Sequence, residues 1–240
     1  MKSLFVAVAV VLGLVVMRGG ASSMRAAEGP PEAEARAALQ KWMTASSKVK
    51  SVTAEFDQLR NLKNVRRPLR KEGKIWMVKE GGKLRWQIGE PPTMMVLRGA
   101  DGGMTVLDVP DKKARMWSRE SLMEQEKAGK GQGFSSMMEA MQTPSLEEFE
   151  KRFTLEKWRV DPANPAFWEF DLSFKDRRTS LVVMQLRLAV NTADGALRSM
   201  TLNMRDGSAM TTQMRSYILN QTIPASTFQV SLEGYKVEQE

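Results

Sequence analysis

In the run FWEFDLSFK, at residues 167–175, every second side chain is apolar: Trp168, Phe170, Leu172 and Phe174. The run LVVMQLRLAV, at residues 181–190, repeats this alternation through Val182, Met184, Leu186, Leu188 and Val190. Successive side chains of a β-strand point to opposite faces, so a period of two predicts two strands with one apolar face each. The two runs therefore indicate a β-sheet that buries one of its faces.

Shorter runs with the same alternation lie on both sides of these two strands. They begin at residue 49 and continue at 70–79, 83–88, 93–98, 104–108, 114–117, 153–160, 197–204, 208–219 and 228–232. Turn residues separate them, for example Gly81-Gly82, Glu90-Pro91-Pro92 and Asp101-Gly102-Gly103. Such short connections are typical of antiparallel hairpins. We expect about ten strands in one strongly curved antiparallel sheet.

Two segments show helical spacing instead. Between residues 32 and 46 the apolar residues recur every three or four positions, as in an amphipathic helix: Ala35, Ala38, Leu39, Trp42 and Met43. Residues 119–152 predict two or three short helices, and Ser145-Leu-Glu-Glu148 is a capping-box pattern that begins the last one. A single sheet must cover its apolar face, so we expect these helices to close an open barrel with room for one ligand.

The first 27 residues have the order of a secretory signal peptide. Lys2 is followed by an apolar run from Leu4 to Met17, then by Arg18 and several small residues. The apolar run has 14 residues, whereas a membrane-spanning helix needs about 20. We therefore expect export and cleavage between residues 21 and 27, which leaves one domain at 28–240. No cysteine is present to accept a lipid at the cleavage point, so we expect a soluble mature protein.

The composition excludes several classes of function. Removing residues 1–27 takes away three cations and no acid, which lowers the formal charge from +8 to +5. Cations cluster only at Arg66, Arg67, Arg70 and Lys71, so we expect no nucleic-acid partner, while attraction to anionic headgroups or to an acidic partner stays open.

The chain contains no histidine and no cysteine. These absences exclude disulfides, Ser-His-Asp triads, cysteine-dependent hydrolysis and nearly all zinc sites. Glu147 and Glu148 form an acidic pair of the kind that acid–base catalysis uses, but they fall on an expected exposed helix face. We therefore expect no enzyme, no metal and no cofactor.

Several short motifs carry a resemblance that runs from Leu39 to Val237. They are Phe56-Asp-Gln58-Leu-Arg60, Gly73-Lys-Ile-Trp76, Leu84-Arg85-Trp86, Pro91 or Pro92, Asp101-Gly102, and Asn220-Gln-Thr-Ile223-Pro224-Ala-Ser-Thr-Phe228. In this order they are similar to the motifs of the periplasmic outer-membrane lipoprotein carrier family, LolA. The resemblance implies a mainly β fold, in which an incomplete barrel is covered by the N-terminal helix and by a helical lid insertion at 119–152.

The resemblance also implies a function. Such a protein is a periplasmic carrier that binds the acyl chains of lipoproteins in an apolar cavity and ferries them between membranes. Its partners would be an acylated lipoprotein or another lipid, an inner-membrane transporter and, as a further candidate, an outer-membrane acceptor. Each methylene removed from water contributes about 0.8 kcal/mol, so acyl chains need an escort across an aqueous space. We expect a monomer.

The residues that would form the site follow from the expected sheet and lid. The cavity candidates are Phe56, Gln58, Trp76, Trp86, Met94, Val96, Met104, Val106, Met116, Trp168, Phe170, Leu172, Met184 and Leu186. The lid candidates are Leu122, Met123, Met137, Met138, Met141 and Phe149. Flexible methionine side chains can repack around ligands of variable shape. Apolar residues at such spacing are also typical of an ordinary core, and a filled barrel would make a rigid interaction domain.

One loop departs from the family pattern. The family's loop between the second and third strands usually carries Arg-Pro, whose arginine is thought to latch the lid, whereas this chain has Lys79-Glu-Gly-Gly-Lys83. Lys79 is a substitute donor without the forked geometry of a guanidinium. Two other functions therefore stay open on the same fold: an envelope sensor or regulator, and a carrier of another amphiphile such as a glycolipid.

Overall fold

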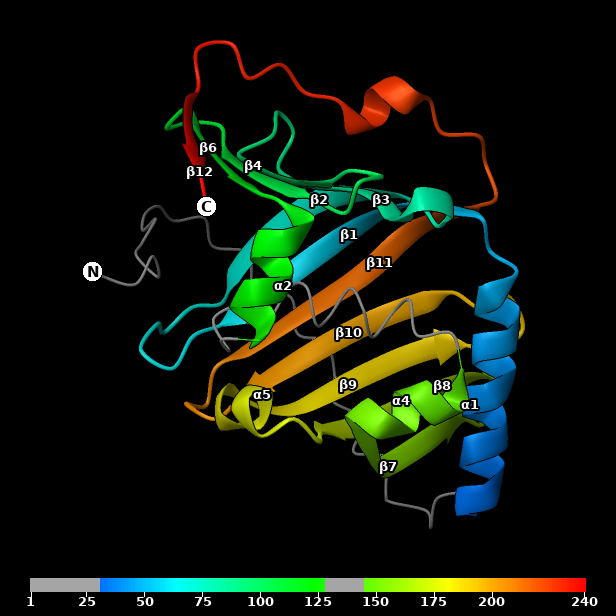
Figure 1. The fold of residues 1–240 in the computed structure, drawn as a ribbon. Coiled ribbons are helices and arrows are strands. Elements are labelled where there is room, and N and C mark those ends of the chain that lie inside the picture. The colour runs from blue at the N-terminus through cyan, green and yellow to red at the C-terminus, as the bar shows by residue number, and fades with distance from the viewer. Residues whose placement is uncertain (1–30, 128–144) are drawn as a thin grey trace.

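The computed structural model describes residues 31–127 and 145–240, and Figure 1 shows how their elements are arranged. The signal peptide expected at 1–27, its cleavage point between 21 and 27, and the lid candidates Met137, Met138 and Met141 lie outside these residues. The described part is mainly β, with twelve strands in one sheet.

The strands follow the sequence alternation closely. They are β1 (Ser51–Asn61), β2 (Leu69–Val78), β3 (Lys83–Ile88), β4 (Met94–Arg98), β5 (Met104–Asp108), β6 (Lys113–Trp117), β7 (Phe153–Asp161), β8 (Asn164–Phe174), β9 (Val183–Asn191), β10 (Leu197–Met204), β11 (Ala209–Leu219) and β12 (Lys236–Gln239). The expected strands at 83–88, 104–108 and 197–204 have these same bounds in the structure.

The sheet consists of two antiparallel meanders joined in the middle. Its order is β12-β6-β5-β4-β3-β2-β1-β11-β10-β9-β8-β7, so β1 and β11 form the junction. Neighbouring strands are antiparallel except β12, which pairs with β6 in parallel. The sheet does not close, because β12 and β7 end it on opposite sides. The predicted single, open, antiparallel sheet is thus confirmed.

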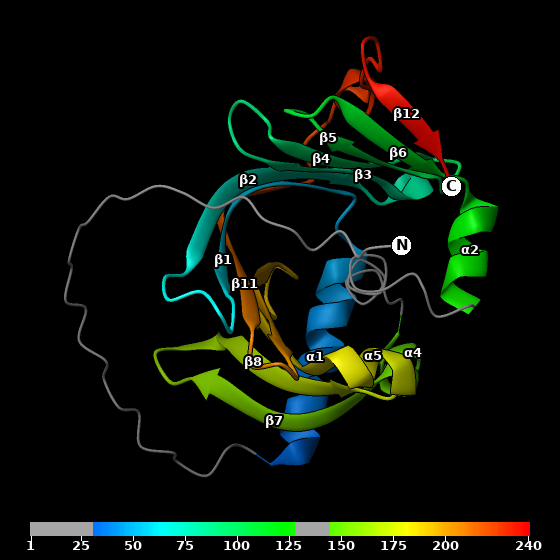
Figure 2. The ribbon, with the colours of Figure 1, turned by 90° about the vertical axis from the view of Figure 1, so that its left-hand side faces the viewer.

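The sheet is strongly bent. The register shifts between Ala54 and Phe56 in the β1–β11 pair and twice in the β9–β10 pair, and such bulges bend a strand and increase its twist. Figure 2 shows the resulting curve, from β7 and β8 at the bottom to β3–β6 at the top, with α1 (Glu32–Ser47) on the hollow side. We call the hollow side the concave face and the opposite side the convex face.

Four helices accompany the sheet in the described residues: α1, α2 (Arg119–Lys127), α4 (Leu146–Arg152) and α5 (Arg177–Val182). The buried residues of α1 are the predicted ones, Ala35, Ala38, Leu39, Trp42 and Met43, and they join the main core. Two short 3₁₀ helices, η1 (Glu80–Gly82) and η2 (Ala225–Phe228), complete the elements.

One predicted strand begins later than expected, and another does not form. The expected strand at 181–190 begins only at Val183, because α5 occupies the preceding residues; Asp176 starts this helix by accepting a hydrogen bond from the Thr179 amide at 2.7 Å. The expected strand at 228–232 does not form. These residues are a covering segment on the convex side, and the chain adds a strand only at β12.

The core has two parts. The main cluster lies on the concave face and includes Phe56, Trp86, Phe170 and Leu186. A smaller cluster of Met95, Leu97, Leu107 and Ala114 lies on the other side of β4–β6, under a C-terminal segment that contributes Val230, Leu232 and Tyr235. None of the helices in residues 31–127 and 145–240 is long and apolar enough to cross a membrane.

Candidate functional site

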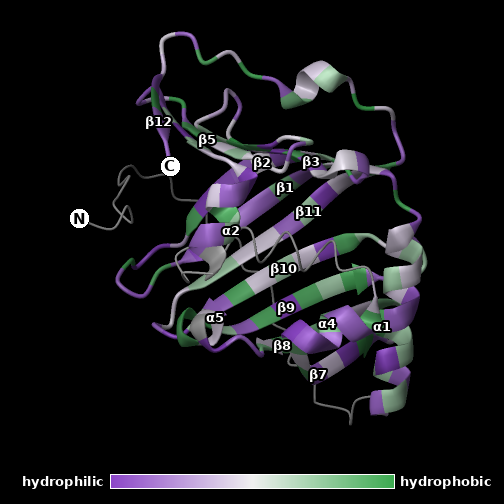
Figure 3. Ribbon diagram, viewed as in Figure 1, coloured by the Kyte–Doolittle hydropathy of each residue, from purple (hydrophilic) through white to green (hydrophobic). Residues whose placement is uncertain are grey.

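The concave face is a continuous apolar surface. The rings of Phe56 of β1 and Trp86 of β3 pack at a tilt with centroids 4.3 Å apart, and the stacked rings of Trp168 and Phe170 of β8 are 5.9 Å apart. These rings come from both meanders, so the apolar surface crosses the β1–β11 junction. Figure 3 shows the alternation that produces it along β9 and β10, where hydrophobic residues follow polar ones.

Helix α1 covers one end of the concave face. The indole Nε1 of Trp42 donates to the Gly195 carbonyl at 3.1 Å. Gly195 has a φ of +74°, and a Cβ there would lie 2.4 Å from the Ser46 nitrogen, so only glycine allows this close approach of the β9–β10 turn to the helix. Lys79 holds the same helix end, since its Nζ donates to the carbonyl and to the hydroxyl of Ser46. Lys79 therefore ties the β2–β3 loop to α1, and burial lowers its pKa.

Helix α4 packs on β7 at the end of the sheet. The Ser145 hydroxyl accepts a hydrogen bond from the Glu148 amide at 3.2 Å, which confirms the predicted start of this helix. Phe149 is fully buried and lies 4.8 Å from Phe153 between ring centroids. Phe153 in turn lies 5.1 Å from Phe174. The lid candidate Phe149 is thus packed into the core.

Part of the concave face remains partly exposed. The residues that pack against the main core without being fully buried include Met94, Met104, Val106, Met204 and Met210. They lie on β4, β5, the end of β10 and the start of β11. An apolar surface with long, flexible thioether side chains at its margin can adapt to hydrocarbon of variable shape.

A small polar group lies inside this apolar surface. Gln58 and Thr212 are 3% and 1% exposed, and the Gln58 Nε2 donates to the Thr212 Oγ1 at 3.3 Å. The Gln58 Oε1 accepts a hydrogen bond from the Arg60 Nε at 2.7 Å. Burial lowers the pKa of Arg60. The alternation along β1 places Phe56, Gln58 and Arg60 on the same face.

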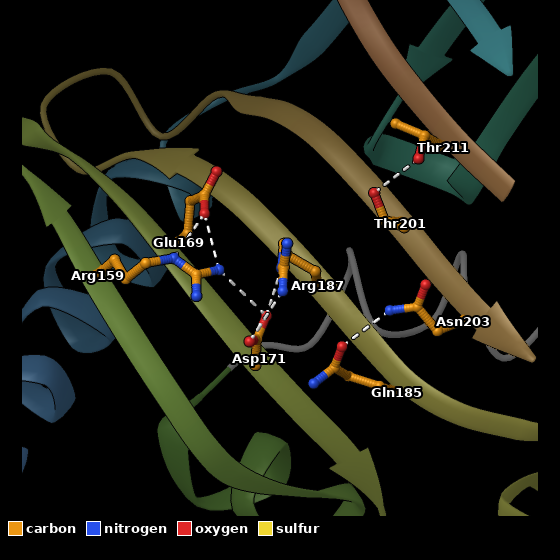
Figure 4. Close-up of polar contacts among 8 residues, drawn as sticks. All are labelled: Arg159, Glu169, Asp171, Gln185, Arg187, Thr201, Asn203 and Thr211. Atoms are coloured by element: carbon orange, nitrogen blue, oxygen red, sulfur yellow. Dashed lines mark hydrogen bonds and ion pairs between the residues drawn. The ribbon is translucent and has the colours of Figure 1, made fainter. Parts of the chain in front are cut away.

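The convex face of β7–β11 carries a row of paired polar side chains. Arg187 binds Asp171 through two hydrogen bonds of 2.6 and 3.1 Å, and Arg159 contacts both Glu169 and Asp171. Gln185–Asn203 and Thr201–Thr211 pairs continue the row across β9–β11, as Figure 4 shows. We call these eight residues the convex ladder. Polar groups that satisfy one another offer little to an apolar ligand, so the concave face is the better candidate for a binding surface.

Most of the predicted cavity residues lie together on the concave face. Phe56, Gln58, Trp86, Val96, Trp168, Phe170, Leu172 and Leu186 are buried there, and Met94, Met104 and Val106 are partly exposed beside them.

Three predicted residues lie elsewhere. Trp76 is on the other face of β2, where the Arg85 guanidinium stacks on its ring at 5.4 Å. Met116 is also on the outer side, where it lines a groove of about 570 Å³ with Leu97 and Phe228. The placement of these two side chains on the concave face is corrected. Met184 is 53% exposed, beside the register shift at the start of β9.

The lid candidates have separate positions. Leu122 and Met123 are on α2, and Met123 is 48% exposed, so this helix does not insert them into the main core. Residues 31–127 and 145–240 contain no cluster of acidic residues able to hold a metal ion. Sequence reasoning missed Arg60 and Thr212. The strand period of two could have placed Arg60 on the concave face, because it stands two positions after the cavity candidate Gln58 on the same strand.

Comparisons with known proteins add fold information only. The sequence matches no protein-family model and no curated protein. Among solved structures, an uncharacterized conserved protein from Thermus thermophilus superposes with a TM-score of 0.52 at 7% identity, over 86% of this chain and 99% of that chain. A LolA superfamily protein from Nitrosomonas europaea gives a TM-score of 0.39 at 10% identity, over 82% and 97%. A chain of the Pseudomonas aeruginosa MucA/MucB complex gives 0.46 at 11% identity, over 83% and 62%.

The architecture is the one that the sequence resemblance implied: one open, curved sheet with helices on its hollow side. The β2–β3 loop that carries Lys79 meets the C-terminal end of α1, so a lysine makes the loop-to-helix contact at that place.

Proposed function

We propose that this LolA-like protein binds the hydrocarbon chains of a lipid or lipoprotein on its concave face and carries them through the periplasm. One observation carries the proposal: the two faces of the sheet differ. The concave face is apolar and keeps Met94, Met104, Val106, Met204 and Met210 partly exposed, while the convex ladder pairs its own polar groups.

The energetics favour hydrocarbon as the guest. Removal of each methylene from water contributes about 0.8 kcal/mol, so even a single acyl chain supplies enough free energy for specific binding on such a surface. The proposal is of a binding protein and not of an enzyme, because neither histidine nor cysteine is present in the chain and general acid–base or nucleophilic chemistry most often uses them.

Direct binding measurements test the proposal. Delipidated protein should bind a fluorescent acyl probe and should form a stable complex with a triacylated lipoprotein. Mass spectrometry of the purified protein should also find co-purifying lipid or acylated protein. Binding of free lipid without lipoprotein would favour another amphiphile as cargo. Binding of neither would favour an interaction domain with a filled core.

A matched pair of variants locates the binding surface. Val106 is partly exposed on the concave face, and Ile218 is 49% exposed on a strand at the β1–β11 junction. Val106→Asp should weaken probe binding at least about tenfold, because it places a charge against hydrocarbon. Ile218→Asp should leave binding unchanged, since Ile218 is on the convex face. Its cross-strand partner Thr53 stands between the concave residues Val52 and Ala54 and therefore points to the opposite side. Equal effects of the two variants would contradict the assignment of the concave face.

A further inference from the structure

Arg60 brings a positive charge to the apolar face of the sheet. It stands two residues beyond Gln58 and four beyond Phe56, both of which are buried in or beside the main core. Its cross-strand neighbours are Leu69 on β2 and Met210 on β11. The guanidinium therefore lies beside hydrocarbon and thioether groups at one end of the concave face.

The position of the guanidinium is fixed by two buried polar groups. The Arg60 Nε donates to the Gln58 Oε1 at 2.7 Å, and Gln58 is held in turn by the Thr212 hydroxyl at 3.3 Å. Gln58 and Thr212 are almost completely buried, so neither can turn toward water without leaving an unsatisfied polar group behind. This arrangement uses one of the five N–H donors of the arginine, and no group in residues 31–127 and 145–240 accepts a hydrogen bond from its terminal nitrogens.

Arg60 differs from the arginines around it. Arg70 and Arg215 both contact Asp57, Arg159 contacts Glu169, and Arg187 contacts Asp171. In residues 31–127 and 145–240, the Arg60 guanidinium makes no ion pair with a carboxylate. Burial is the cause of its lowered pKa, as expected for a cation that has lost water without gaining an anion.

The chemistry of this site specifies its ligand. A guanidinium with free terminal N–H groups matches the two oxygens of a carboxylate or a phosphate. The apolar surface that continues from Met210 toward Phe56 matches a hydrocarbon chain. We propose that Arg60, positioned by Gln58 and Thr212, binds the anionic headgroup of an amphiphile whose hydrocarbon lies along the concave face. This inference rests on the proposed function and adds the class of cargo: an acidic lipid bearing a carboxylate or a phosphate.

The test compares ligands that differ only in charge. Delipidated full-length protein is titrated with a fluorescent fatty acid, with its neutral methyl ester, and with a lysophospholipid that ends in a phosphate, at a pH where the acids are ionised. The fatty acid should bind about tenfold or more tightly than the ester, the gain expected from a charge-assisted hydrogen bond. The tighter of the two acidic ligands identifies the carboxylate or the phosphate as the preferred headgroup.

Three variants test whether Arg60 causes the preference for the acid over the ester. Arg60→Met should reduce the ratio of ester to acid dissociation constants to about one, because methionine removes the charge and keeps an apolar stem at this position. Arg60→Lys should retain part of the preference, since it keeps the charge and loses the fork. Arg67→Met, on the exposed loop between β1 and β2, removes the same charge away from the concave face and should change nothing.

The outcomes separate this inference from the proposed function. Equal binding of acid and ester by the unmodified protein, or a preference that survives Arg60→Met, would overturn the headgroup site and leave hydrocarbon binding in place. Failure of all three ligands to bind would overturn both. Thermal unfolding of Arg60→Met provides the folding check, and a variant that has lost its fold would be replaced by Arg60→Gln in the same titrations.

Discussion

Gly73 shows how closely the concave face is packed at the scale of a single residue. A Cβ on this residue would lie 2.3 Å from the Cζ of Phe56 and 2.2 Å from the Gln87 carbonyl oxygen. Phe56 is fully buried and its ring also contacts Trp86, so the ring has no free space to enter. Glycine is required at this position on β2 because both the phenyl ring and the Gln87 carbonyl oxygen lie directly against it.

Gly73→Ala should therefore lower the free energy of unfolding by about 1–3 kcal/mol, the usual range for overpacking a core. Chemical denaturation measures the change. Adding Phe56→Leu to this variant should recover part of the loss, because the shorter side chain ends before the position of Cζ. If the double variant loses the full sum of the two single losses, contact with the ring is not the cause.

Tyr217 provides a pH-dependent signal from the β1–β11 junction. Burial raises the pKa of its phenol to about 12 from an ordinary value of 10.0. Below pH 10 the phenol is neutral in both the folded and the unfolded chain. As the pH rises from 10 toward 12, the unfolded chain loses this proton first, so the stability that the neutral phenol contributes is lost across this window.

The measurement uses a variant with a single tyrosine. The chain contains two tyrosines, Tyr217 and Tyr235, so Tyr235→Phe leaves only the phenol of interest. Phenolate absorbance after a rapid pH jump should show ionisation near pH 12 in the folded protein. Tyr217→Phe should remove the corresponding loss of stability in alkali. Ionisation of the native protein at the ordinary pKa of a phenol would contradict the loss of water that raises the pKa of Tyr217.

At the scale of the element, α4 depends on its first residue. It has only seven residues, too few for an isolated helix to be stable in water. The Ser145 hydroxyl caps its first turn, and the buried Phe149 packs it into the main core.

Ser145→Ala should lower the free energy of unfolding by about 1 kcal/mol, because it leaves the Glu148 amide without its acceptor. Ser145→Asp is the matched control and should keep most of the stability, since a carboxylate also caps the amide. Thermal melts of the two variants make the comparison, and equal loss in both would rule out a capping role.

The strands show which features of an element can be read from the sequence. Alternation located the described strands from β1 to β11 well, because each has a face that must be apolar. It missed β12, whose four residues Lys-Val-Glu-Gln are mostly polar. This strand exists because the edge of β6 needs a partner, and that cause lies more than a hundred residues away from it in the chain.

Alternation separates two faces but does not say which one meets the ligand. Between β3 and β6 both faces carry apolar residues, because the C-terminal segment covers a second cluster on the outer side. Trp76 and Met116 satisfied the pattern and yet face outward. Arg60 is charged, so an apolar pattern does not select it, and yet it shares the face of Gln58. A site of this kind needs the three-dimensional position of its cover as well as the period of its strands.

At the scale of the whole molecule, the C-terminal segment completes the convex side of the first meander. Val230, Leu232 and Tyr235 pack over Met95 and Leu97, which are almost fully buried. The segment also carries Thr227, whose carbonyl accepts a hydrogen bond from Arg85 at 3.1 Å.

Deletion of residues 229–240 should expose this second cluster. We expect increased binding of a hydrophobic dye, self-association and a lower unfolding midpoint, because the segment covers apolar area and one sheet edge. Dye fluorescence and light scattering measure the change. Lys236→Gln with Glu238→Gln is the control that keeps the cover, and it should behave as the unmodified protein. A deletion variant that stays monomeric and does not increase the dye fluorescence would show that the segment is dispensable.

The junction of β1 with β11 also determines when the chain can fold. Val52 pairs with Leu219, so the centre of the sheet joins residues from the two ends of the domain. Contacts of such long sequence separation form slowly, since the entropy of closing a large loop is lost before the contacts contribute any stabilisation. The first meander therefore has an uncovered strand edge at β1 until translation has passed residue 219, and the sheet cannot be completed before that point.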